Sequence, residues 1–173
     1  MPKEKITSTS KGRGSVNPVI ISDKAADVIA FIVHVFGGKH DEGALTYDHD
    51  GTIFHSEVHV DDTTLIVAER KHGWPFTPAF LQVYVVDVEA ALQRAKELGG
   101  KVITEPTDYV GVKFSRVQDP QGNIWWVWSV LEHYDWEAAL GHGSGEEAWK
   151  PTREAVYVHD SLVQAMEALG KDS

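Results

Sequence analysis

Two stretches of the chain repeat one order of apolar and polar positions. Residues 19–22 and 83–86 are short, mainly β-branched runs, and each is followed by an aspartate, Asp23 or Asp87. Apolar residues then recur at helical spacing in both copies, at Ala25, Ile29, Ile32, Val33 and Phe36 and at Val88, Ala91, Leu92, Ala95 and Leu98. The aspartates are expected to cap the helices. Paired glycines after each helix, at 37–38 and 99–100, are expected to end it, because glycine adopts the left-handed conformation readily.

Three strand-like stretches follow each expected helix. They lie at about 40–47, 53–60 and 64–70 in the first copy and at about 101–105, 112–118 and 124–130 in the second. Turn-forming residues occupy the same place in both copies, at 61–62 and 119–123, and a loop with two prolines, 72–78, joins the copies. The pattern predicts an α+β fold of two tandem βαβββ modules, residues 16–71 and 79–130; chance repetition of a βα unit is the alternative.

Outside these modules the chain has a different character. Residues 1–15 are polar and are expected to form a flexible tail, and the glycine-rich stretch 141–145 is expected to break the chain. Within the extension 131–173, a third helix is expected over about 152–169. Its apolar stripe comprises Val156, His159, Leu162, Val163, Met166 and Leu169. The stripe needs cover, either from its own domain or from a neighbouring subunit.

Composition narrows the range of functions. The 173 residues include no cysteine, which excludes disulfides, thiolate metal sites and a thiol nucleophile. A formal net charge of −10 opposes binding to nucleic acid or to anionic membrane surfaces. Neither a secretion signal nor an apolar run long enough to span a membrane is evident. We therefore expect a cytoplasmic protein without nucleic-acid or membrane partners.

Several motifs in this order resemble the vicinal-oxygen-chelate superfamily, which includes glyoxalases, bleomycin-resistance proteins and dioxygenases, and in particular its PhnB-like branch. Residues 119–126, DPQGNIWW, are similar to the D-P-x-G-N-x-W-W turn and last strand of that family. The helix end at 30–38 and the strand at 55–62 are also similar, and the resemblance covers residues 16–130. It implies one domain with a cupped mixed sheet, which a second subunit often completes, and hence a homodimer.

The resemblance also implies where a metal ion would be held. Metal-dependent members bind one divalent ion through four side chains, and the matching positions here are Val16, Ile66, Phe80 and Trp126. None of these can ligate a divalent ion, which needs carboxylate oxygen or imidazole nitrogen. The expectation is therefore a protein with no metal at these positions and no cofactor.

Polar side chains alternate along the expected strand 53–60. His55, Glu57 and His59 share one face, and Phe54, Ser56, Val58 and Val60 share the other. One interpretation is an ordinary solvated strand face. The other is a ligand-binding face, on which the histidines exchange protons and Glu57 pairs with a cationic ligand. The most specific form of this second interpretation is a displaced metal site. Successive same-face positions are about 7 Å apart, however, so one ion would need ligands from elsewhere.

Tryptophans mark the last strand of the second copy. Trp126 and Trp128 share a face, and with Trp74 in the connector they form the candidate aromatic part of a binding site. Such a wall suits a flat or apolar ligand, with an added cation–π contribution if the ligand is positive. The alternative is packing in the core or at a dimer interface.

Three functions remain open at this level. The first is a metal-free protein, similar to bleomycin-resistance proteins, that binds a small planar or hydrophobic molecule through His55, Glu57, His59, Trp74, Trp126 and Trp128. The second is a metal-dependent lyase, isomerase or dioxygenase with a relocated site around His55, Glu57 and His59. The third is a non-catalytic regulatory or scaffolding protein. No catalytic residue can be named from the sequence.

Overall fold

The computed structural model describes residues 14–109, 111–130 and 152–169. The chain divides into two compact units, Met1–Thr77 and Pro78–Ser173, here called unit 1 and unit 2. The boundary falls within the loop 72–78 that was expected to join the two copies. Residues 1–13 of the expected tail and the expected break at 141–145 lie outside the described residues.

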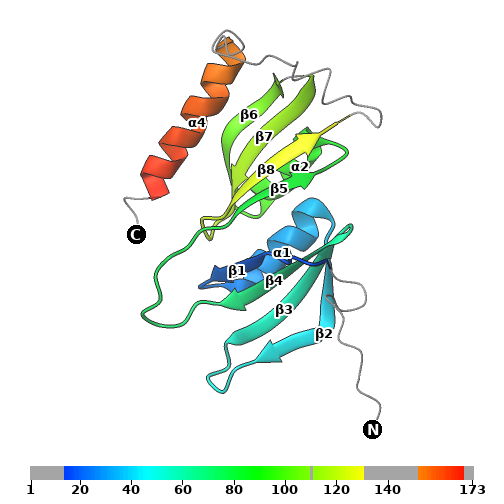
Figure 1. Ribbon diagram of the computed structural model, residues 1–173, viewed down its shortest axis with the longest axis vertical. Helices are drawn as coiled ribbons and strands as arrows, with labels where there is room; N and C mark the ends of the chain where they lie inside the picture. The colour runs from blue at the N-terminus through cyan, green and yellow to red at the C-terminus, as the bar shows by residue number, and fades with distance from the viewer. Residues whose placement is uncertain (1–13, 110, 131–151, 170–173) are drawn as a thin grey trace. The chain divides into compact units, whose positions relative to one another are not determined.

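Unit 1 contains one helix and a four-stranded mixed sheet (Figure 1). Its elements are β1 (Val19–Ser22), α1 (Ala25–Phe36), β2 (Lys39–Tyr47), β3 (Ile53–Val60) and β4 (Thr63–Glu69). The strand order is β1-β4-β3-β2, with β1 parallel to β4 and the other neighbours antiparallel. The helix α1 makes the crossover from β1 to β2, which run parallel at the two edges of the sheet, as in a βαβ connection.

Unit 2 repeats this topology and adds a helix. Its elements are β5 (Phe80–Tyr84), α2 (Val88–Glu97), β6 (Lys101–Tyr109), β7 (Val112–Gln118), β8 (Ile124–Ser129) and α4 (Arg153–Leu169). The strand order is β5-β8-β7-β6, with β5 parallel to β8. The predicted fold class, α+β with two βαβββ modules and a C-terminal helix, is confirmed.

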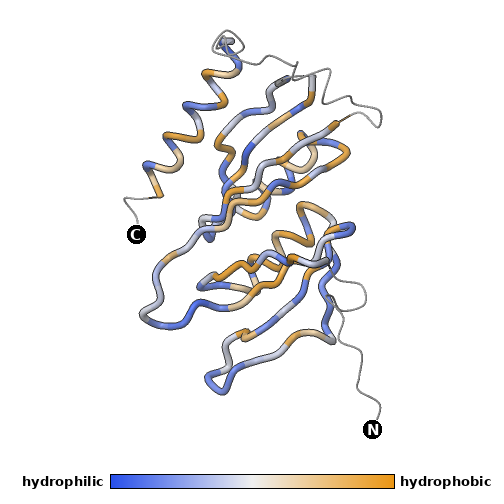
Figure 2. Tube along the Cα trace, in the orientation of Figure 1, coloured by the Kyte–Doolittle hydropathy of each residue, from blue (hydrophilic) through white to orange (hydrophobic). Residues whose placement is uncertain are grey.

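The core of unit 1 lies between α1 and one face of its sheet. Val28, Ile32 and Val35 on α1 are fully buried, as are Val58 and Val67 on the sheet. The apolar colouring of α1, β1 and β4 in Figure 2 follows this packing. Side chains on the β3 positions that alternate with Val58 therefore point to the other face of the sheet.

The two helices begin differently, which corrects one expectation from the sequence. Asp87 caps α2 as expected, since its side chain accepts a hydrogen bond from the Ala90 N–H at 2.9 Å. Asp23 does not cap α1; the N-cap is Lys24, which has no side-chain capping bond. Asp23 instead pairs with both Nε and Nη2 of Arg70, at the end of β4. A cap needs only local sequence, whereas this ion pair depends on the tertiary fold that brings Arg70 to Asp23.

The 119–123 turn is built around a buried carboxylate. Asp119 Oδ1 accepts hydrogen bonds from the backbone N–H groups of Gln121 (3.0 Å) and Asn123 (2.9 Å), and Oδ2 accepts from Asn123 Nδ2 (2.8 Å) and Trp125 Nε1 (3.1 Å). Asn123 in turn accepts a bond from the Ala79 N–H just before β5. Burial raises the pKa of Asp119, and the hydrogen bonds oppose that rise. The most distinctive motif of the chain thus has a structural role, joining the start of β5 to that of β8.

The helix α4 packs on β6 through a different face from the one predicted. Val158 and Ser161 are its buried residues, whereas Val156, Val163 and Met166 of the predicted stripe stay 46%, 39% and 42% exposed. The spacing of apolar residues did not predict the buried face of α4, because polar groups make much of its contact with the sheet. Three of its hydrogen bonds run from Thr104 to Ser161 (2.7 Å), from the Glu105 N–H to the Tyr157 hydroxyl (2.9 Å) and from Arg116 to the Val158 carbonyl (2.6 Å).

Among the residues that the structure describes, no helix is both long enough and apolar enough to cross a membrane.

Candidate functional site

The polar side chains of β3 stand on the sheet face opposite α1. His55, Glu57 and His59 alternate with Ser56 and Val58, both of which are fully buried. Glu57 is itself buried, with 1% of its surface exposed, and His55 and His59 are half-buried. An ordinary solvated strand face is therefore the wrong description at Glu57, because a carboxylate is not removed from water without compensation.

Glu57 is held by hydrogen bonding. Its Oε1 lies 2.8 Å from His55 Nε2, on the neighbouring same-face position of β3. His59 is oriented separately, since its Nδ1 lies 3.0 Å from the hydroxyl of Thr64, the residue opposite it on β4. Thr64 is buried. Both imidazole rings are thus fixed by partners within unit 1.

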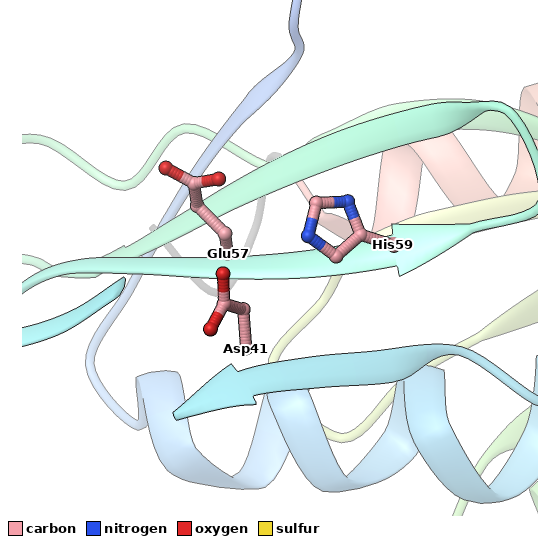
Figure 3. Close-up of side chains that lie close together, drawn as sticks. All are labelled: Asp41, Glu57 and His59. Atoms are coloured by element: carbon pink, nitrogen blue, oxygen red, sulfur yellow. The ribbon is translucent and has the colours of Figure 1, made fainter. Parts of the chain in front are cut away.

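A fourth ligand-type side chain, Asp41, joins His55, Glu57 and His59 from the neighbouring strand β2. Asp41 on β2 lies directly opposite Glu57 on β3 in the antiparallel register. Figure 3 shows the side chains of Asp41, Glu57 and His59 close together, and ligand atoms of the three residues all lie within 4.8 Å of one another. The sequence analysis missed Asp41, because an irregularity in β2 between Asp41 and Thr46 shifts its pairing with β3, and local patterning does not specify such a shift.

The four positions that match the family's metal ligands carry apolar side chains that cannot bind a divalent ion. Val16 precedes β1 and is 84% exposed, and Ile66 lies opposite Glu57 on β4. In unit 2, Phe80 begins β5 and Trp126 lies on β8. Apolar side chains at all four positions offer no oxygen or nitrogen ligand to a divalent ion.

An aromatic face occupies the corresponding surface of the unit 2 sheet. We give this name to Phe114 on β7 and to Trp126 and Trp128 on β8. The Phe114 ring makes edge contacts with both indoles, at centroid distances of 6.1 Å to Trp126 and 4.8 Å to Trp128. Both tryptophans are half-buried, and Phe114 is buried. Edge-to-face contacts of this kind hold the rings in fixed orientations.

Arg116 is the residue of this face that the sequence analysis missed. Its guanidinium carbon lies 4.6 Å from the Phe114 ring centroid and 4.5 Å from that of Trp126, and the side chain is 4% exposed. Its Nη1 donates to the Val158 carbonyl of α4 at 2.6 Å and to the Thr104 hydroxyl at 3.2 Å. Pairing the strands 112–118 and 124–130 through the 119–123 turn would have found it, since Arg116 lies directly opposite Trp126.

The predicted site residues thus belong to two groups. His55, Glu57 and His59 lie together in unit 1, and Trp126 and Trp128 lie together in unit 2. Trp74 lies in the connector of unit 1 and is 53% exposed. The indole nitrogen of Trp126 is buried and has no hydrogen-bond acceptor within the part of the chain that the structure describes.

Comparison with known proteins places the fold in a family. The family model described as "Glyoxalase/Bleomycin resistance protein/Dioxygenase superfamily" matches residues 17–127. An uncharacterised protein of Mycobacterium tuberculosis is 28% identical over 123 residues, which is 64% of this chain and 71% of the relative. An uncharacterised protein of Mycobacterium bovis matches with the same identity over 80% of its length.

Solved structures share the fold at lower identity. TioX from Micromonospora sp. ML1 is 21% identical, with a TM-score of 0.52 over 67% of this chain and 99% of its own. The fosfomycin resistance protein FosX from Listeria monocytogenes is 13% identical, with a TM-score of 0.55 over 69% and 94% of the two chains. A PhnB protein from Bacillus cereus is 14% identical, with a TM-score of 0.53 over 68% of this chain and 100% of its own. The match of the family model over most of the two modules shows that this chain belongs to the glyoxalase/bleomycin resistance protein/dioxygenase superfamily.

Proposed function

We propose that the protein binds a small planar organic molecule on the aromatic face of unit 2, with no metal ion at the four positions that relatives use. In this proposal residues 16–130 form one domain of the superfamily, and residues 131–173 are an extension. The observation that carries the proposal is the half-buried Trp126, which contacts Phe114 and Arg116 within its own unit. Its buried indole N–H also has no acceptor within the described residues.

A flat ligand is expected to gain more binding free energy from the aromatic face than a ligand of another shape, because it can lie against the rings. Oriented aromatic rings offer a large contact area at little entropic cost, and each ring pair is worth about 0.5–1.5 kcal/mol beyond area burial. A ligand acceptor at the Trp126 N–H would satisfy a buried donor whose desolvation otherwise costs about 1–3 kcal/mol. A flat molecule with an acceptor group therefore fits better than a purely hydrocarbon one.

Arg116 changes the expected charge of the ligand. The sequence favoured an added cation–π contribution for a positive ligand, but the Arg116 guanidinium lies 4.5 Å from the Trp126 centroid and already makes that interaction. A second cation would be repelled by the first. Neutral or anionic planar compounds are therefore expected to bind more tightly than cationic ones of the same size.

We also propose that the protein is a homodimer. Phe80 and Tyr84 on the edge strand β5 are 41% and 55% exposed. Large apolar side chains on a sheet edge favour association with another chain. A second subunit would cover these side chains, as the resemblance to the superfamily implies.

Ligand binding is tested by tryptophan fluorescence and calorimetry on the full chain. A screen of flat aromatic compounds, in matched neutral, anionic and cationic forms, should yield some that quench emission saturably. Trp126→Ala should weaken these compounds by at least ~1 kcal/mol, about fivefold, the lower end for removing an indole that stacks on a ligand in a desolvated site. Trp126→Phe should recover part of the affinity, because it restores an aromatic ring.

The matched control is Trp125→Phe, which alters an indole on the opposite face of β8. This variant should bind the compounds like the wild type. Melting curves of all variants establish that each is folded. If no compound quenches the wild type, or if Trp126→Ala and Trp125→Phe lower affinity equally, the aromatic face is packing and the proposed function is wrong.

A further inference from the structure

We propose that Asp41, Glu57 and His59 in unit 1 bind one divalent first-row transition-metal ion. The ligands would come from β2 and β3, whereas the resemblance to metal-dependent relatives points to the first and last strands of each module. The proposal does not depend on the ligand site of unit 2. It rests on three features of the described residues: the facing carboxylates, the orientation of His59 and the spacing of the three ligand atoms.

The first feature is the pairing of two carboxylates across adjacent strands. Asp41 and Glu57 are directly opposite in the register of β2 and β3. Like charges at directly opposed positions destabilise a sheet, and the cost rises when one of them is removed from water, as Glu57 is at 1% exposure. A cation between the two carboxylates would turn this repulsion into attraction.

The second feature is how His59 is held. Its Nδ1 is hydrogen-bonded to the buried Thr64 hydroxyl at 3.0 Å. In Figure 3 the ring extends toward the two carboxylates, which brings its other nitrogen, Nε2, to their side. When Nδ1 donates its proton to Thr64, the lone pair of Nε2 faces the carboxylates. Metal-binding histidines in proteins are oriented in this way, by a hydrogen bond from the nitrogen that does not ligate.

The third feature is distance. Successive same-face residues of one strand have Cα atoms about 7 Å apart. The ligand atoms of Glu57, His59 and Asp41 are closer, and all lie within 4.8 Å of one another. Ligand atoms at about 2.1 Å around one tetrahedral ion lie about 3.4 Å apart. The widest pair would therefore have to approach by about 1.4 Å when the ion binds.

The donor set indicates the class of ion. Two carboxylates and one imidazole suit ions such as Zn²⁺ and Mn²⁺ better than the all-oxygen shells that Ca²⁺ and Mg²⁺ prefer. Three protein ligands leave at least one coordination position for water or a small molecule. His55, which bonds Glu57 Oε1 at 2.8 Å, would orient that carboxylate from outside the coordination shell.

The experiment is calorimetric titration of the full chain, purified without a tag and treated with chelator, using Zn²⁺ and Mn²⁺ separately. One ion per chain should bind saturably and raise the melting temperature as its concentration increases. Asp41→Asn, Glu57→Gln and His59→Gln should each weaken binding at least tenfold. Thr64→Val, which removes only the bond to Nδ1, should weaken it by about tenfold or more.

Asp62→Asn and His49→Gln are the matched controls. They make the same exchanges as Asp41→Asn and His59→Gln, but at exposed positions of unit 1 outside the proposed site. They should bind the ion like the wild type. Glu57→Gln alters a buried group, so a second measurement avoids dependence on its folding: Zn²⁺ should shift the imidazole NMR signals of His59 in the wild type and not those of His49. The proposal is overturned if the wild type shows no saturable binding, or if an ion binds but leaves His59 and the ligand variants unaffected.

Discussion

Replacing Asp119 by asparagine tests the role assigned to the 119–123 turn. The substitution keeps size and shape but exchanges one carboxylate oxygen for an NH₂ group. The remaining oxygen can still accept the backbone N–H groups of Gln121 and Asn123. The NH₂ group then faces Asn123 Nδ2 and Trp125 Nε1, which are both donors and which the carboxylate satisfies at 2.8 and 3.1 Å.

The expected cost follows from the two donors that are left without an acceptor. A buried donor left without a partner costs about 1–3 kcal/mol, so the free energy of unfolding should fall by about 2–6 kcal/mol. This is a large part of the roughly 5–15 kcal/mol available to a typical domain. Urea unfolding followed by circular dichroism measures the loss, with the slope of the transition checked for two-state behaviour.

A double-mutant cycle with Trp125→Phe provides the control. Phenylalanine removes one of the two donors that Asp119→Asn leaves without an acceptor. Asp119→Asn should therefore lower the free energy of unfolding by about 1–3 kcal/mol less in that background than in the wild type. Additive effects of the two substitutions would refute the hydrogen bond between these side chains. A loss below about 1 kcal/mol in the wild-type background would refute the structural role of the whole turn.

The raised pKa of Asp119 adds a pH dependence with a definite sign. The folded protein holds this proton more firmly than the unfolded chain, whose reference pKa is 3.8. The corresponding stability is therefore fully present below pH 3.8 and is lost as pH rises through the higher folded-state pKa. Asparagine does not titrate, so the destabilisation caused by Asp119→Asn should decrease as pH rises above about 4. A destabilisation that increases with pH would show that hydrogen bonding outweighs burial.

Two further predictions concern the assembly and the hairpin between β2 and β3. Light scattering at micromolar concentration should give twice the 19.2 kDa mass of the chain, and a monomer would remove the dimer proposal. Lys71 donates to Asp48 (2.8 Å) and to Asp50 (3.0 Å), and its hydrogen bond is the main cause that lowers the pKa of Asp48 from 3.8 to about 2. Lys71→Met should raise that pKa toward 3.8, and the stability lost by the substitution should be present above pH 3.8 and vanish as pH falls through about 2. Carboxyl NMR titration measures the pKa, and an unchanged value for Asp48 would contradict the assigned pairing.

The repeated pattern was sufficient to predict the fold because it is local. Strand, helix and turn signals each depend on neighbouring residues, and their recurrence in both copies identified two βαβββ modules. Left-handed glycines do end the helices, with φ angles of 72° at Gly37 and 80° at Gly99. Alternation along β3 and β8 also placed His55, Glu57 and His59 on one face and Trp126 with Trp128 on another, because strand geometry alone determines which side chains share a face.

Only the tertiary structure decided which residues from different elements meet. Asp41 lies opposite Glu57 because of the register between β2 and β3. Asp23 forms an ion pair with Arg70 and does not cap α1 as expected. Burial of Glu57 and the polar docking of Ser161 against Thr104 likewise depend on packing over long sequence separations. Local propensity carries no information about such contacts, since their energies arise only once the chain has brought the partners together and removed them from water.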